Sequence, residues 1–499
     1  MRDGSSINTA FREGSAEPAP LRLSAWAAIA LALLALAVAT RIATYGHPDL
    51  HVDETFYFAA AIEMLHGAVP FVDAWDRKPP GHFLLYAGIA AISDWYGSYQ
   101  IAATVFAAAT SLVIFGSARR LAGHWPALIG AALYLLVICQ FQGHGGQSAV
   151  FYNLFIAAAG LQLITAIDRG ERSLRQTRIA LAMILAGTAI TIKTTALFEA
   201  AFFGMFAAGL LLRQDGWTTP SIARIAGWAA LALLPSAVFA LWYALHGYWD
   251  EYWTAMVLSN LRKPVDSIGS AERLTILAAM LLPLAAASLI ALARMPHRFR
   301  LFGAGWLIAA TVGFFSVPAY YLHYALPLLV PLCVIAPACL AMPRTGTFLL
   351  GIAGVMPLLF YPFFDFAETR HASAAMERLV AAVEPSKGDG PLLVFDGPPL
   401  LYPLTGSRFP TPLAFPNHLH QASERNVSHL DTRAEVERIL ALRPGAIVDR
   451  NTWVTNTETS ALVRSYARKH CRKVAAEPMT KGWKVKVIVY GHCRAPDRR

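Results

Sequence analysis

The chain has 499 residues, of which 56% are hydrophobic and only 15% are charged, and its mean hydropathy is +0.44. This composition excludes a soluble globular protein of this length and predicts a polytopic membrane protein. The formal net charge of +10 is typical of a membrane protein with basic cytoplasmic loops, and we expect no nucleic-acid partner. Five cysteines exclude a dense disulfide framework.

The N-terminal 22 residues are polar, and an apolar run follows at 23–39. This run ends without a clear small-residue cleavage site, so we expect a retained signal anchor rather than a removed signal peptide. Residues 1–22 are then a cytoplasmic tail.

Eleven apolar stretches are long enough to cross about 30 Å of hydrocarbon. They lie near residues 23–42, 99–117, 124–142, 150–167, 178–195, 196–212, 223–245, 272–293, 300–318, 322–341 and 347–364. A twelfth stretch, 80–97, is short, contains Asp94 and opens on two prolines.

The arginines of the later loops decide whether 80–97 spans the membrane. If it does not span, the cytoplasmic loops hold the basic residues and the outer loops hold few, as the positive-inside rule requires. These basic residues are Arg119, Arg120, Arg169, Arg172, Arg175, Arg178, Arg213, Arg224, Arg294, Arg298, Arg300 and Arg344. We therefore predict an interfacial helix on the outer side, with a full span as the less favoured alternative.

The expected architecture is an α-helical membrane domain at 23–365 with about 11–13 transmembrane helices and a first outer loop at 43–98. The tail at 366–499 alternates helical patterns (371–384, 431–443, 458–470) with the apolar runs PLLVFD, GAIVD and KVKVIVY, which predicts a small α/β domain on the outer side. The outer side of a bacterial inner membrane is oxidising. Cys471 and Cys493 therefore either form a disulfide or remain as two unpaired structural thiols.

Charged residues gather in the first outer loop. Asp53 and Glu54 open a helical pattern typical of an amphipathic helix on the membrane surface. Acids favoured by the helix macrodipole are the plainer interpretation. However, Asp73, Asp76 and Lys78 follow within the same loop, and acids beside a bilayer are costly and usually functional.

Two lysines are candidates for binding an anion. Lys78 precedes two prolines, which stiffen the turn back toward the membrane. Lys193 lies at the outer end of its span, where a cation points to an anionic group such as a lipid-linked phosphate. His323 and Tyr324 are expected at the same depth, either as part of an aromatic belt or as ligands of phosphate oxygens.

A carboxylate that can act as a base, together with cations that can stabilise a phosphate leaving group, predicts glycosyl transfer from a lipid phosphate. A transporter or flippase of lipid-linked sugars is the alternative, but it predicts internal repeats and charges at mid-membrane, which the sequence does not show. A third alternative, a membrane anchor that presents the tail as a binding module, leaves the charges of the first loop unexplained.

Four segments resemble the membrane-embedded GT-C fold glycosyltransferases, in particular the superfamily of protein O-mannosyltransferases and lipid A aminoarabinose transferases. In family order they are VDETFYFAAAIEML, DAWDRKPPG, TIKTTALF and HYALPLL. The resemblance implies an inverting transfer from a polyprenyl-phosphate sugar, with Asp53 as catalytic base and Glu54 beside it. It also implies that Lys78 and Lys193 contact the donor phosphate. His323 and Tyr324 are further candidates for that contact, and Tyr57, Asp73, Asp76 and Arg77 are expected to support the site.

The sequence departs from this family at the DE motif. The aminoarabinose transferases have an Arg and a Glu where this chain has Phe56 and Ala59, so we do not expect an identical sugar or acceptor. We expect no required cofactor, and a divalent metal ion, if one binds, at Asp53 and Glu54. The expected partners are the lipid-linked sugar donor, membrane lipids, and an envelope glycan such as lipopolysaccharide, a lipid or a protein as acceptor. The expected location is the bacterial inner membrane, with the site and tail facing the periplasm.

Overall fold

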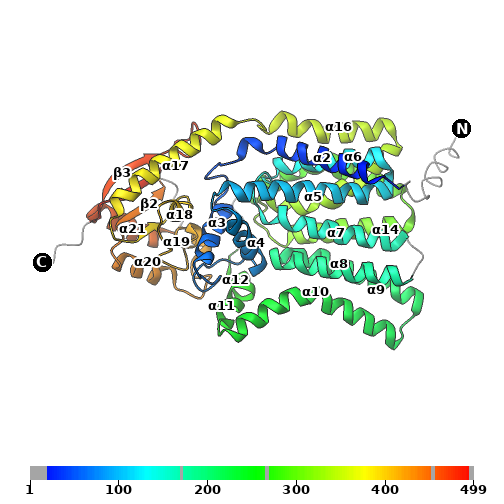
Figure 1. Ribbon diagram of the computed structural model, residues 1–499, viewed down its shortest axis with the longest axis horizontal. Coiled ribbons are helices and arrows are strands. Elements are labelled where there is room, and N and C mark those ends of the chain that lie inside the picture. Colours follow the sequence, from blue (N-terminus) through cyan, green and yellow to red (C-terminus); the bar gives the residue numbers. More distant parts are fainter. Residues whose placement is uncertain (1–19, 169–171, 265–268, 451–455, 494–499) are drawn as a thin grey trace. The chain divides into compact units, whose positions relative to one another are not determined.

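The computed structural model describes residues 20–168, 172–264, 269–450 and 456–493 (Figure 1). The chain divides into two compact units. The first, called the helical unit here, comprises Met1–Ile42, Ala102–Phe239 and Ser267–Phe364. The second, called the mixed unit, comprises Ala43–Ile101, Ala240–Asp266 and Asp365–Arg499. The first outer loop therefore groups with the C-terminal tail.

Every one of the eleven expected spans is helical. Within the described residues, seven helices are long and apolar enough to cross a membrane: Gly97–Ala122, Ser148–Ile167, Thr194–Asp215, Thr219–Leu245, Ser270–Arg294, Leu322–Ala341 and Pro343–Phe360. The other four are α2 (Leu23–Ala39), α6 (His124–Gln140), α8 (Arg172–Ile192) and α14 (His297–Phe315). These four fall outside the set of seven because α2 and α6 have only 17 residues each, and because α8 and α14 begin with basic residues that lower their hydropathy. The chain is a multi-pass membrane protein.

Small residues allow the helices of the helical unit to approach closely. A Cβ atom at Gly187 of α8 would collide with the backbone carbonyl of Ala232 in α10 (Thr219–Leu245). One at Gly160 of α7 (Ser148–Asp168) would collide with the ring of Trp306 in α14. Such close approach is how membrane helices gain packing energy without a hydrophobic drive between them.

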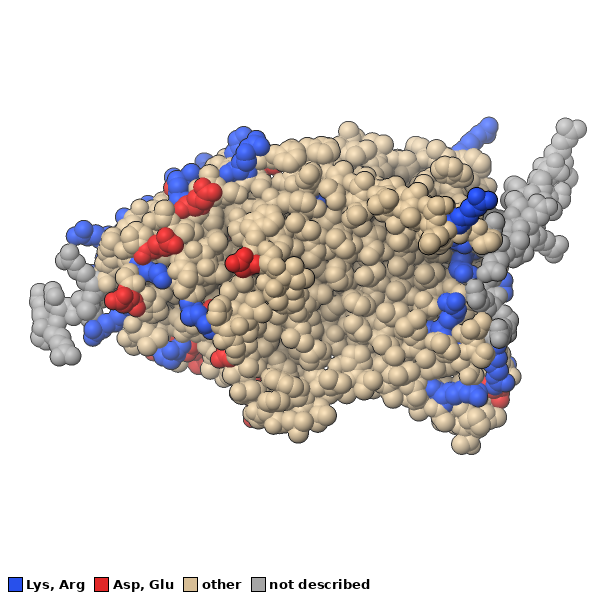
Figure 2. Space-filling model, in the orientation of Figure 1, with Lys and Arg blue, Asp and Glu red and all other residues tan. Residues whose placement is uncertain are grey.

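Charged residues are scarce along the helices of this unit. Figure 2 shows Lys and Arg gathered at one end of the helical unit, and an almost uncharged face along the helices. Arg119 and Arg120 lie in the last turn of α5 (Gly97–Ala122), and Arg213 lies in the last turn of α9 (Leu197–Asp215). Basic residues at one end of the helices are the distribution that the positive-inside rule predicted from the sequence.

The segment after the two prolines forms a separate helix, α4 (Pro80–Ile92). Its 13 residues rise about 20 Å, which is less than the roughly 30 Å of a hydrocarbon core. The length favours the expected interfacial helix over the alternative of a full span. It packs against α3 (Val52–Leu65), the helix that carries Asp53 and Glu54.

The tail folds as a four-stranded sheet with helices, as expected for an α/β domain. The strand order is β1-β2-β4-β3, with β1 (Leu392–Val394) parallel to β2 (Ala446–Arg450) and the remaining pairs antiparallel. Helices α17 (Phe366–Lys387), α20 (Thr432–Ala441) and α21 (Thr457–His470) appear where the three helical patterns lie. The sequence pattern missed β3 (Arg472–Glu477), because this edge strand opens on Arg-Lys and lacks an apolar run.

A disulfide joins Cys471 and Cys493, so the first of the two alternatives is confirmed. These residues flank β3 and β4 (Val487–Gly491), which pair as antiparallel neighbours. The free cysteines Cys139, Cys333 and Cys339 are buried, as their apolar surroundings predict.

Candidate functional site

The start of α3 presents the acids Asp53 and Glu54. His51 caps the helix, and its Nδ1 accepts a hydrogen bond from the backbone N–H of Asp53 at 3.4 Å. Burial lowers the pKa of His51, which favours the neutral ring that this contact requires. Glu54 is 1% exposed, whereas the Asp53 side chain is 22% exposed and so is open to other molecules.

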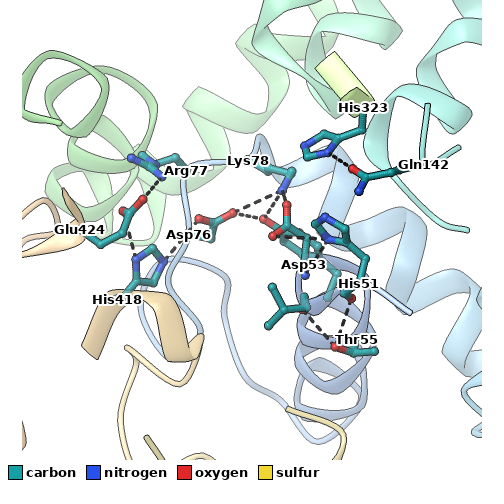
Figure 3. Close-up of polar contacts among 12 residues, drawn as sticks. His51, Asp53, Thr55, Asp76, Arg77, Lys78, Gln142, His323, His418 and Glu424 are labelled. Atoms are coloured by element: carbon teal, nitrogen blue, oxygen red, sulfur yellow. Dashed lines mark hydrogen bonds and ion pairs between the residues drawn. The ribbon is translucent and has the colours of Figure 1, made fainter. Parts of the chain in front are cut away.

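Lys78 pairs with Asp53. Its ammonium donates to Asp53 Oδ2 at 3.1 Å (Figure 3). It also donates to the Tyr57 hydroxyl at 3.2 Å. Asp53 and Tyr57 are four residues apart and lie on one face of α3. Pro79 precedes α4 as its N-cap in an extended conformation, so the turn that carries Lys78 is stiff.

Tyr57 is held in place by α4. The rings of His82 and Phe83 contact its ring edge-on, with centroids 4.4 and 5.1 Å away. Its hydroxyl donates a hydrogen bond to Oδ2 of Asp76. Asp53, Tyr57, Asp76 and Lys78 therefore form one group, called the Asp53 cluster below.

Asp76 is a buried, ionised member of this cluster. It is 4% exposed, and Lys78 Nζ lies 3.9 Å from its Oδ2. Burial raises the pKa of this carboxyl, but His418, Lys78 and Arg77 together outweigh burial and lower it to about 2. The carboxylate is therefore charged at any physiological pH.

Four further residues form an ion network beside the cluster, in which two are buried (His418 and Glu424) and two are half-buried (Arg77 and Lys263). His418 Nε2 lies 3.4 Å from Asp76, and its Nδ1 lies 3.4 Å from Glu424 (Figure 3). Glu424 also contacts Arg77 at 2.8 Å and Lys263 at 2.6 Å. Burial raises the pKa of Glu424, but His418, Arg77 and Lys263 outweigh it and lower the pKa well below its usual value.

Sequence reasoning missed His418, Glu424 and Lys263. His418 belongs to the short helix α19 (Pro416–His420), and Glu424 closes the 3₁₀ turn Ala422–Glu424. The available signal was weak: two histidines within Pro-Asn-His-Leu-His, followed by one acid in a polar tail. Arg77, expected to support the site, contacts Glu424 of this network.

Asp73 has a different environment from Asp76. It is exposed, and its carboxylate accepts the backbone N–H of Val69 at 2.7 Å. Asp73 therefore stabilises the turn before Ala74, and we find no contact that joins it to the Asp53 cluster within the described part of the chain.

The second set of expected residues lines a pocket in the helical unit. Lys193 lies in extended backbone between α8 and the 3₁₀ turn Thr194–Ala196, and its ammonium lies 5.2 Å from the ring centroid of Tyr324. His323 approaches Gln142 at 3.1 Å and packs edge-on against Tyr324 at 4.6 Å. Lys193, His323 and Tyr324 all line this pocket.

Glu199 lines the same pocket and was not expected. It is 2% exposed and accepts a hydrogen bond from the indole N–H of Trp306 at 2.7 Å. An acid inside the apolar run ALFEA was the signal for it, since acids within membrane segments are costly and usually functional.

No metal centre is apparent among the described residues. Residues 20–168, 172–264, 269–450 and 456–493 contain no group of three or more His, Cys, Asp or Glu that could hold a metal ion. Asp53, one of the two candidate ligands, contacts Lys78 at 3.1 Å.

No protein-family model and no curated protein sequence matches the chain. Among solved structures, it is similar to ArnT from Cupriavidus metallidurans bound to undecaprenyl phosphate, with 14% identity, a TM-score of 0.59, and coverage of 94% of this chain and 98% of that one. The apo state of that protein gives a TM-score of 0.57 with 14% identity, over 93% of this chain and 98% of that one. The oligosaccharyltransferase AglB from Archaeoglobus fulgidus, in complex with an inhibitory peptide and a dolichol-phosphate, gives 0.48 with 12% identity over 85% and 69% of the two chains. The chain therefore has the fold of ArnT, which confirms the expected fold class.

Proposed function

We propose that this chain, with the fold of ArnT, is an inverting membrane glycosyltransferase that moves a sugar from a polyprenyl-phosphate donor to an acceptor. The observation that carries the proposal is the pair of Asp53, at the start of α3, and Lys78, in the turn before α4; they are 3.1 Å apart and Asp53 is accessible. A carboxylate acts as a base only when it is ionised, and an adjacent cation stabilises that form.

The reaction requires one base and one good leaving group. Asp53 takes the proton of an acceptor hydroxyl or phosphate, and the acceptor oxygen forms a bond to the anomeric carbon. The bond between that carbon and the phosphate oxygen breaks, and the polyprenyl phosphate leaves with the electron pair. A cation near the departing phosphate lowers the barrier because it stabilises charge that develops in the transition state.

The ArnT structure bound to undecaprenyl phosphate supports a lipid phosphate as the donor for this chain. Lys78 and Lys193 are the cations that we propose for the donor phosphate, with His323 and Tyr324 beside Lys193 as further ligands. Lysine ammonium groups bind phosphate oxygens by charge-assisted hydrogen bonds.

We propose the bacterial inner membrane as the location, with Asp53 and the tail facing the periplasm. The disulfide Cys471–Cys493 supports an oxidising compartment for the tail. The basic residues at one end of the helical unit support a cytoplasmic position for that end. The proposed acceptor is an envelope glycan such as lipopolysaccharide, a lipid or a protein.

A transfer assay tests this function. Membranes containing the full chain are incubated with radiolabelled polyprenyl-phosphate sugars and an envelope fraction, and compared with Asp53→Asn and with Asp94→Asn, an exposed acid of the same loop. We expect Asp53→Asn to lose at least about a hundredfold in rate, the usual contribution of a general base, and Asp94→Asn to retain transfer. Full transfer by Asp53→Asn would remove Asp53 as the base, and absence of transfer by the wild type with every donor would remove the proposed function.

A further inference from the structure

His418 links the C-terminal domain to the Asp53 cluster. Its side chain is 2% exposed and is enclosed by the rings of Trp75, at 4.7 Å, and Phe415, at 5.1 Å. The backbone N–H of Trp75 donates to the carbonyl of Pro412 at 2.8 Å, so the loop that carries Asp76 is attached to the chain segment that leads into α19. The imidazole therefore lies between Asp76 and Glu424, 3.4 Å from each.

The charges alternate along this series of contacts. Arg77 and Lys263 contact Glu424, Glu424 contacts His418, and His418 contacts Asp76. Burial lowers the pKa of His418, but the two carboxylates outweigh burial and raise it above its usual value. The raised pKa favours the protonated ring, which would separate two carboxylates that otherwise repel each other.

Asp76 is shared between His418 and Lys78. Its Oδ1 faces His418 at 3.4 Å, whereas its Oδ2 faces Lys78 at 3.9 Å and accepts the Tyr57 hydroxyl. The ammonium of Lys78 lies closer to Asp53, at 3.1 Å. Without a cation on its Oδ1 side, the buried Asp76 carboxylate would be less well compensated, and Lys78, already 3.9 Å from Oδ2, is the cation of the cluster that could move closer to it.

We propose that His418 is a positioning residue for the Asp53 site: it neutralises Asp76 and thereby keeps the ammonium of Lys78 on Asp53. This inference rests on the proposed function, because it assigns to the C-terminal domain a part in the reaction of Asp53. The domain would complete the charge arrangement of the site from a distant part of the sequence. The neighbouring pair Arg77–Glu424, for example, is separated by 347 residues.

A purely structural role for His418 predicts a different outcome, and His420 provides the matched control. His420 lies on the same helix and also faces a carboxylate, Asp396 at 3.7 Å, which in turn faces Arg450 at 3.8 Å. That series leads to Asp49 rather than to Asp76. His420→Gln therefore removes an imidazole of the same helix that faces Asp396 rather than Asp76.

The test measures the accessibility of Asp53 as well as transfer. The full chain is treated with a carbodiimide and an amine, and modification of Asp53 is quantified by mass spectrometry for the wild type, His418→Gln and His420→Gln. We expect His418→Gln to raise Asp53 modification severalfold, because Lys78 moves toward Asp76, and to lower kcat about tenfold to a hundredfold with little change in donor KM. We expect His420→Gln to match the wild type in both.

A double variant keeps the proposal testable if His418→Gln alone does not fold. In Asp76→Asn with His418→Gln the carboxylate and its partner are removed together, so no unpaired charge is left buried. We expect the double variant to show the same Asp53 modification and kcat as Asp76→Asn alone.

Two results would overturn the inference: unchanged Asp53 modification in folded His418→Gln, or a further change in the double variant relative to Asp76→Asn. Because the modification is measured without a donor, it decides the inference even if the wild type transfers no sugar. Absence of sugar transfer by the wild type would refute only the proposed function.

Discussion

The two candidate cations have different surroundings. Lys78 in the mixed unit lies between Asp53, Tyr57 and Asp76, at 3.1, 3.2 and 3.9 Å. Lys193 in the helical unit lies over the ring of Tyr324, in a pocket that also contains Glu199. An ammonium between carboxylates is part of a charge arrangement set before any substrate binds. An ammonium on an aromatic face gives up a cation–π contact of about 0.5–2 kcal/mol when it binds an anion. We therefore expect Lys78 to act chiefly on the chemical step and Lys193 chiefly on binding.

The largest effect is expected at Lys78. Lys78→Met leaves Asp53 and Asp76 without their shared cation, and we expect kcat to fall about a hundredfold or more, as when one preorganised charge is removed from a reaction site. Steady-state kinetics with the radiolabelled donor measures it. Lys263→Met is the matched control, because Lys263 contacts Glu424 and not Asp53, and a smaller loss is expected there. Equal losses in the two variants would show that Lys78 has no special relation to Asp53.

The buried charges predict a pH dependence of stability. The pKa of Asp76 is lowered from 3.8 to about 2, so its contribution is present above pH 4 and is lost as the pH falls toward 2. This difference corresponds to about 2 kcal/mol. The pKa of His418 is raised from 6.5, so its contribution is present below pH 6.5 and declines as the pH rises through the raised value. The ion network is therefore most stabilising between about pH 4 and 6.5.

Thermal unfolding of the full chain in detergent, measured between pH 3 and pH 9, checks this dependence. We expect the wild type to lose stability on both sides of that window. His418→Gln should lack the decline at alkaline pH, and Asp76→Asn should lack the part of the acid decline that Asp76 contributes. A wild-type profile that is flat above pH 6.5 would contradict the charged state of His418.

A smaller effect is expected at Lys193. Lys193→Met should raise the donor KM about tenfold, the equivalent of roughly 1.4 kcal/mol, and lower kcat less than Lys78→Met does. Arg213→Met is the control, because Arg213 is an exposed basic residue in the last turn of the helix that begins at Leu197, just after Lys193. A fall in kcat at unchanged KM would place Lys193 with Lys78 and remove the distinction between the two cations.

Some features of the site were predictable because they are local. The pair Asp53-Glu54, the turn at Lys78-Pro79-Pro80 and the lysine between two apolar runs all stand out against an apolar background, where each charge is costly. Asp73 and Asp76 could not be told apart in this way. The two identical side chains are three positions apart, yet one is exposed and hydrogen-bonded to Val69 and the other is 4% exposed beside His418.

By itself the sequence determined the membrane class, the positions of the eleven apolar helices, the α/β tail, and the acids and the lysine of the first loop. Periodicity and composition report such features because each depends on residues within one or two turns of one another. Only the tertiary structure decided that His418, Glu424 and Lys263 belong beside Asp76, that β3 closes the sheet, and that the first loop groups with the tail. Buried ion pairs join residues hundreds of positions apart, and which carboxylate receives which cation depends on how the chain packs, because a buried charge is stable only where a partner of opposite sign is brought to it.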